Sequence, residues 1–171
     1  MSVKFQDFSF EVKAKINEES IAWLYETANE ITSQAQRNCS LGEEYSSQLR
    51  ESYRYDVDET KGEALVGSPL EQAFWEEFGT GSYADMSKNG GRPGRQGWWV
   101  YIEGGSGYEK PTKHYSTKED AERAAAFLRN VKKLNAQVSN GRAPNYTLEK
   151  AFTKTKPKAI AELERRMKEM G

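Results

Sequence analysis

Hydrophobic and polar positions alternate near the start of the chain. Apolar residues occupy every second position from Phe8 to Ile16, with polar residues between them. This period is typical of a half-buried β-strand, so the pattern predicts a strand over 8–16. The apolar spacing then changes to three and four residues, which predicts an amphipathic helix over 18–37.

The next patterned stretch predicts a β-hairpin followed by a capped helix. Apolar and charged residues alternate from residue 52, and a turn-like Glu-Thr-Lys-Gly precedes a second apolar run that ends at Gly67. Ser68 and Glu71 have the spacing of a capping box. Gly79 is suited to ending the helix because it accepts positive φ.

The second half of the chain contains one long irregular stretch. Residues 81–97 hold five glycines and no apolar periodicity, which predicts a flexible loop. The patterns after it predict these elements, in order: a strand over 98–103, a helix over 118–135 capped by Thr117 and Asp120, a loop over 136–146, and a final helix from Leu148 that kinks or restarts at Pro157. The polar stretch 38–51 carries no clear pattern.

The order of these elements predicts a single α+β domain over residues 1–171. Helices would pack against a mainly antiparallel sheet of about four strands, with residues 98–140 as a strand-and-helix insertion. Consecutive aromatic residues, Phe74-Trp75 and Trp98-Trp99, cannot all point into one core. At least one of each pair is expected to be exposed or to face a partner chain.

Composition narrows the function classes. The 171 residues carry 25 basic and 26 acidic side chains, so the net charge is −1. A general polyanion-binding protein would be clearly basic. One cysteine allows no internal disulfide and agrees weakly with a reducing compartment. No leader sequence and no membrane-spanning run is expected.

No residue pattern predicts catalysis, a cofactor or a metal. The single histidine, His114, has no partner at a zinc-ligand spacing, and the glycine-rich segment lacks a phosphate-binding motif. Glu76, Glu77 and Asp85 could suggest a carboxylate metal site. Adjacent helical residues point about 100° apart, however, so the favoured interpretation is a solvated face with one interface contact.

Two segments resemble a known family. Glu77-Phe78-Gly79-Thr80-Gly81, at the end of a helix, resembles the E-F-G-T signature of bacteriophage tail-component proteins. Residues 143–152 resemble the segment that precedes the closing helix of that family. The early helix and the hairpin occupy matching places in the order of elements. The arginine before the proline is displaced by one position, and 98–140 is additional.

The resemblance implies a structural role without catalysis or cofactor. Members form rings, often hexamers, that terminate the tail or join it to the head connector, with DNA passing through the lumen. The chain would then be assembled in the bacterial cytoplasm and reside in the neck or tail of the virion. The residues expected at a subunit interface are Phe74, Trp75, Glu77, Phe78, Gly79, Thr80, Gly81 and Tyr83. Those expected to face the lumen or DNA are Lys88, Arg92 and Arg95.

Two other functions stay open at this stage. A small nucleic-acid-binding module could use the basic glycine-rich loop for phosphates and exposed tryptophans for stacking on bases. An enzyme with an unrecognised site around His114 is the other, and it has the weaker support in the sequence.

Overall fold

A computed structural model describes residues 9–39, 45–88, 97–102 and 113–170, and these form two compact units. The first unit combines Met1–Cys39, Gln48–Pro69 and Thr147–Gly171, and the second combines Ser40–Ser47 with Leu70–Tyr146. The elements are α1 (Ser9–Asn38), α2 (Tyr45–Ser52), β1 (Arg54–Asp58), β2 (Glu63–Gly67), α3 (Glu71–Phe78), β3 (Thr80–Gly81), β4 (Trp98–Ile102), β5 (His114–Tyr115), α4 (Lys118–Asn130), β6 (Ala136–Ser139), β7 (Gly141–Arg142) and α5 (Thr147–Met170).

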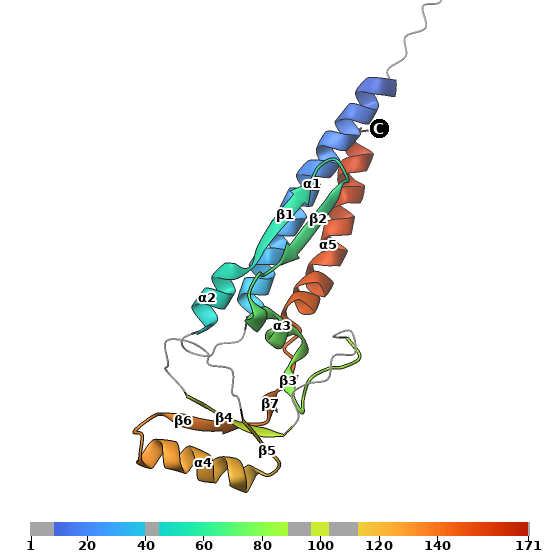
Figure 1. The fold of residues 1–171 in the computed structure, drawn as a ribbon. Coiled ribbons are helices and arrows are strands. Elements are labelled where there is room, and N and C mark those ends of the chain that lie inside the picture. The colour runs from blue at the N-terminus through green and yellow to red at the C-terminus, as the bar shows by residue number, and fades with distance from the viewer. Residues whose placement is uncertain (1–8, 40–44, 89–96, 103–112, 171) are drawn as a thin grey trace, which may run out of the picture. The chain divides into compact units, whose positions relative to one another are not determined.

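In the first unit, the hairpin and α5 both pack against the long helix α1 (Figure 1). β1 and β2 pair antiparallel, and Tyr55 lies opposite Val66. The rings of Tyr25 of α1 and Tyr55 are T-shaped to each other, with the ring centroids 6.4 Å apart. The alternation predicted this hairpin correctly, because one face of each strand is needed to cover α1.

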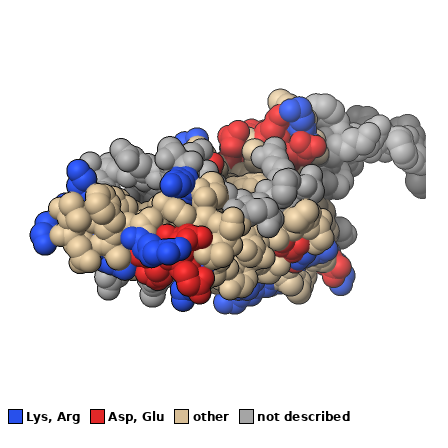
Figure 2. All heavy atoms as spheres, turned by 60° about the horizontal axis from the view of Figure 1, so that its bottom comes forward, with Lys and Arg blue, Asp and Glu red and all other residues tan. Residues whose placement is uncertain are grey.

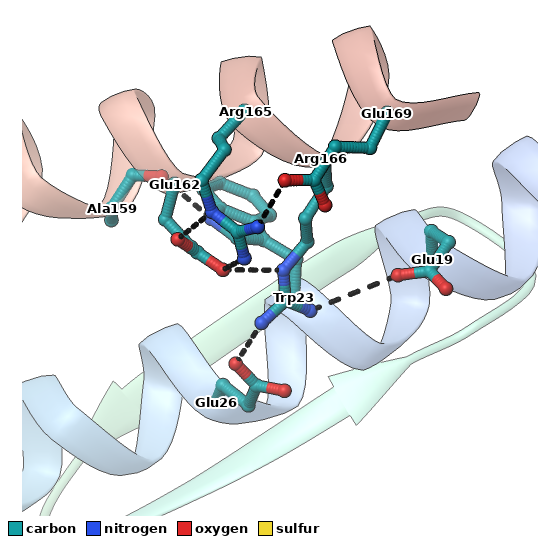
Figure 3. A network of polar contacts seen from close by, with 8 residues as sticks. All are labelled: Glu19, Trp23, Glu26, Ala159, Glu162, Arg165, Arg166 and Glu169. Atoms are coloured by element: carbon teal, nitrogen blue, oxygen red, sulfur yellow. Dashed lines mark hydrogen bonds and ion pairs between the residues drawn. The ribbon is translucent and has the colours of Figure 1, made fainter. Parts of the chain in front are cut away.

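A network of hydrogen bonds and ion pairs joins α1 to α5 (Figure 3). The Trp23 indole N–H donates to the carbonyl oxygen of Ala159 at 2.7 Å. Arg166, only 16% exposed, pairs with Glu26 of α1 and with Glu162 of its own helix. These contacts fix how the two helices lie along each other, in addition to the apolar residues between them.

The predicted strand at the start of the chain is wrong over the residues that the structure describes. Residues 9–16 form the first turns of α1. The alternation there also places Phe10 and Ala14, and Glu11 and Lys15, four residues apart. Such spacing suits a helix, and an apolar run this short does not separate the two periods.

In the second unit, α4 packs on a three-stranded antiparallel sheet of order β5-β4-β6. Trp99 of the central strand is 6% exposed, and Ala121 and Ala125 of α4 are fully buried. Thr117 caps α4 as predicted, since its hydroxyl oxygen accepts from the Asp120 N–H at 3.2 Å. The strand predicted over 98–103 is confirmed through Ile102.

The α+β class is confirmed, but the described strands do not form one sheet of four. They divide among a two-stranded hairpin, a two-residue ladder of β3 with β7, and the three-stranded sheet. The segment 136–146, predicted to be a loop, supplies β6 and β7. The stretch 38–51 likewise contains most of the helix α2. The prediction of a single domain over 1–171 stays a prediction.

Two local predictions about helix ends need correction. Ser68 does not cap α3: Leu70 is the N-cap residue, without a side-chain cap hydrogen bond, and the Ser68 hydroxyl bonds to that of Ser52 at 2.7 Å. The N-cap of α3 therefore lies two residues later than the sequence predicted. α5 also continues through Pro157 without a restart. Pro157 is exposed, so the carbonyl group that lacks its usual N–H partner can bond to water.

Candidate functional site

The segment with the family-like signature lies in the second unit, against the segment that ends at Tyr146. β3 pairs antiparallel with β7, with Thr80 opposite Arg142 and Gly81 opposite Gly141. The Arg142 N–H also donates to the Thr80 hydroxyl oxygen at 3.0 Å. Two stretches about 60 residues apart in the sequence thus pair as neighbouring short strands.

The backbone of α3 extends this pairing. The carbonyl oxygen of Glu76 accepts from the Asn145 N–H at 2.8 Å, and that of Glu77 accepts from the Tyr146 N–H at 3.3 Å. These are carbonyl groups near a helix end, where partners within the helix run out. The 143–146 segment therefore completes the hydrogen bonding at the end of α3.

Glycine is required in this turn because the two backbones touch. A Cβ atom on Gly79 would lie 2.7 Å from the Arg142 carbonyl oxygen, and one on Gly81 would lie 2.0 Å from that of Asn140. Both residues also have positive φ, 74° and 61°. Gly79 ends α3 as predicted, although its ψ of −178° is extended and not left-handed helical.

Glu76 contradicts the solvated-face interpretation. Its side chain is 3% exposed, and its carboxylate accepts from the Asn145 amide at 2.8 Å and pairs with Arg142 at 3.2 Å. Glu77 is also buried, at 8% exposure. A carboxylate this deep is retained only with charged or hydrogen-bonding partners, and the 142–145 segment supplies them.

A second set of contacts holds the turn that follows β3. The Tyr146 hydroxyl donates to Asp85 at 2.8 Å, and the Lys88 ammonium lies 4.6 Å from the centre of the Tyr146 ring. Hydrogen bonds from Ser87 and Tyr146 hold the pKa of Asp85 below its usual range. The loop predicted to be flexible is thus held by side-chain contacts as far as Lys88. Arg92 and Arg95 lie outside the described residues.

The predicted interface residues differ in their exposure. Gly79, Gly81 and Glu77 are buried, so they shape the turn. Four are half-buried: Phe74, Trp75, Phe78 and Thr80. Tyr83 is 53% exposed, and its neighbour Met86, which the sequence did not single out, is 49% exposed. Tyr83 and Met86 are therefore the apolar side chains of this turn that another molecule can reach most easily.

The features proposed for the other two functions lie elsewhere in the second unit. Trp99 is buried and unsuited to stacking on bases, while Trp98 is half-buried beneath Lys118. On the face drawn in Figure 2, basic and acidic side chains lie next to each other among uncharged ones, and the described residues form no broad basic area there. His114 is exposed on β5, with its ring 6.1 Å from that of Trp99.

Within the described ranges, no three His, Cys, Asp or Glu residues come together to hold a metal ion. No helix in those ranges has the length and apolar character needed to cross a bilayer. Comparisons with models of protein families, with curated proteins and with solved structures gave no match. Function is therefore inferred from the residues and their geometry.

Proposed function

We propose that this chain is a structural subunit of a bacteriophage neck or tail-completion ring, acting as a tail terminator or head-tail joining protein. The observation that supports this best is the pairing of the family-like turn with the start of the second family-like segment and the residues just before it. Residues 76–81 and 140–146 lie far apart in the sequence, yet backbone hydrogen bonds join them, and the exposed apolar side chains of Tyr83 and Met86 follow directly.

A turn of this kind suits an interface that is repeated around a ring. A ring repeats one contact between two different surfaces until it closes, and each contact needs a defined shape. The ladder of β3 with β7, which needs its glycines, fixes the backbone of the turn. Tyr83 and Met86 add exposed apolar side chains beside it. Aromatic and methionine side chains are enriched where subunits meet.

The oligomeric state of the purified protein tests the proposal. Sedimentation over a range of concentrations should reveal a closed ring of about six subunits. Substitution of the buried glycines would be a poor test, because a side chain at Gly79 would disturb the fold itself. The exposed pair is better suited: Tyr83→Ser with Met86→Ser should leave the fold intact and weaken assembly.

The matched control is Phe127→Ser in α4 with Val131→Ser at the C-cap of that helix. These two side chains are 55% and 60% exposed, so the control removes a similar apolar area at another place in the same unit. Truncation of a tyrosine that anchors the centre of an interface costs about 2 kcal/mol or more. The proposed interface is wrong if both pairs of substitutions change assembly equally. A strict monomer that also fails to cap purified tail tubes would exclude the ring function.

A further inference from the structure

One edge of β2, in the first unit, is open to pairing with another strand. Among the described residues, β2 pairs as a strand with β1 alone, so its other edge meets no strand (Figure 1). Glu63, Ala64 and Leu65 are all exposed, and Leu65 is 75% exposed. Edge strands are usually protected from pairing by charges, a proline or a bulge. β2 has one charged residue, no proline and an unbroken register with β1, so little opposes pairing here.

The alternation of the strands decides which side chains accompany this edge. The Tyr55 ring contacts that of Tyr25 in α1, so Tyr55 lies on the face of the hairpin that covers α1. The opposite, outer face therefore consists of three cross-strand pairs: Arg54 with Gly67, Asp56 with Leu65, and Asp58 with Glu63.

The outer face has a cation at one end and an anion at the other. At the turn end, Lys61 pairs with Asp58 at 2.8 Å. Glu63 and Arg54 form no ion pair with another residue that the structure describes. A Cβ atom at Gly67, which lies opposite Arg54, would meet no atom within 4 Å, so the space beside the Arg54 side chain is open.

Antiparallel pairing of β2 with β2 of a second copy, centred on Leu65, is self-complementary. Leu65 then lies opposite Leu65 of the second copy, and Glu63 lies opposite the bare Gly67. Arg54 is one strand beyond Gly67, so its Cα atom is about 10 Å from that of Glu63 in the second copy. Two extended side chains can span this distance across Gly67. The two-fold symmetry repeats the ion pair, which gives a central apolar contact between two pairs of opposite charges.

The edge of β1 lacks this complementarity. The same centred pairing of β1 with itself would place Asp56 directly opposite Asp56 of the second copy, and like charges in that position are destabilising. In the β2 pairing, the two Asp56 residues are separated by both leucines, with about 14 Å between their Cα atoms. The side chains therefore favour β2 as the edge that pairs.

We infer that two copies of this chain pair through their β2 edges about a two-fold axis and form a four-stranded sheet of order β1-β2-β2-β1. A two-fold contact joins identical surfaces, whereas a ring repeats a contact between unlike surfaces. The edge contact thus goes beyond the proposed ring and does not depend on it. It doubles whatever assembly the ring contact makes, at concentrations where the edges pair.

Cysteine cross-linking tests the register. In Leu65→Cys the two Cα atoms would be about 4.5–5.5 Å apart, which suits a disulfide between copies. In the matched control Glu63→Cys they would be roughly 14 Å apart, which is too far. With oxidised glutathione, Leu65→Cys should form a covalent dimer at least about tenfold faster than Glu63→Cys. The native Cys39 is buried and should not compete.

Charge reversal tests the ion pair between copies. Arg54→Glu alone and Glu63→Arg alone each bring like charges together, so each should associate about three- to tenfold more weakly in 50 mM salt by sedimentation equilibrium. A mixture of the two variants restores opposite charges at both ends of the contact. The mixed pair should therefore form within about twofold of the unmodified chain. In 0.5 M salt these differences should shrink, because exposed charges are screened.

The mass of Leu65→Asp separates this contact from the ring. This variant should halve the mass of the assembly, whereas Phe152→Asp in α5, at a side chain that is 52% exposed, should leave the mass unchanged. Both should unfold thermally like the unmodified chain, since both side chains are exposed. A change from about twelve subunits to about six would support the edge contact and the ring together. A change from dimer to monomer would support the edge contact and exclude the ring.

Several results would overturn the inference. A ring of about six whose mass ignores Leu65→Asp at every concentration would exclude the edge contact and leave the ring. A strict monomer, equal cross-linking at the two cysteine positions, or no gain on mixing the charge variants would each exclude it as well. The cysteine and charge variants keep the test decisive if Leu65→Asp fails to fold.

Discussion

Gly81→Ala tests whether the turn after α3 depends on close contact between two backbones. Gly81 and Gly62 have nearly equal φ angles, 61° and 66°. A Cβ atom at Gly81 would lie 2.0 Å from the Asn140 carbonyl oxygen, while one at Gly62 would meet no atom within 4 Å. Gly62→Ala is therefore a control that reproduces the backbone strain without the collision.

The expected magnitudes follow from this difference. A left-handed alanine costs about 1–2 kcal/mol, and this should be the whole effect at Gly62. At Gly81 the ladder must also open, which removes the 2.9 Å hydrogen bond from the Ser82 N–H to Asn140 and a neighbouring one. At about 0.5–1.5 kcal/mol for each bond, Gly81→Ala should lower the free energy of unfolding by about 2–5 kcal/mol.

Urea unfolding followed by far-ultraviolet circular dichroism would measure both variants. Hydrogen exchange, read by mass spectrometry, would show whether the Ser82 amide loses protection in Gly81→Ala alone. Equal destabilisation of the two variants, with the Ser82 amide still protected, would refute the proposed backbone contact.

Three further predictions concern the buried and paired side chains. Glu76→Ala should destabilise the protein by about 2–3 kcal/mol in urea unfolding, since it removes hydrogen bonds to a buried charge, whereas the exposed Glu71→Ala should change it by less than about 0.5 kcal/mol. Trp23→Phe should cost about 1 kcal/mol through the lost bond to Ala159, and an unchanged unfolding midpoint would contradict that bond. Hydrogen bonds from the neighbouring arginines of α5 lower the pKa of Glu162 to about 2 from an ordinary 4.5. Its contribution to stability is therefore present above about pH 4.5 and lost as the pH falls toward 2, so melting temperatures of Glu162→Gln should decline less over this range than those of the unmodified chain.

Features set by neighbouring residues were predictable from the sequence. The hairpin follows from local alternation and a turn, and the Thr117 cap of α4 follows from a side chain three residues before its partner. The end of α3 at Gly79 is also local, because only glycine accepts its backbone angles without strain.

Features that need a distant partner were missed. β6 and β7 are too short to show a period, and they exist because β4 and β3 pair with them. The burial of Glu76 depends on Arg142 and Asn145, more than 60 residues further along. The residues next to Glu76 in the sequence give no sign of these distant partners. The local pattern therefore predicted a solvated side chain.

The discontinuity of the first unit has a consequence during synthesis. Trp23 and the carbonyl group of Ala159 that it contacts are 136 residues apart in the sequence. At roughly 5–20 residues per second, a ribosome needs on the order of 7–27 s between making one and the other. Throughout that interval the side of α1 that α5 later covers is open to water, chaperones and other nascent chains. The second unit, whose main segment Leu70–Tyr146 is continuous, leaves the ribosome before α5 does.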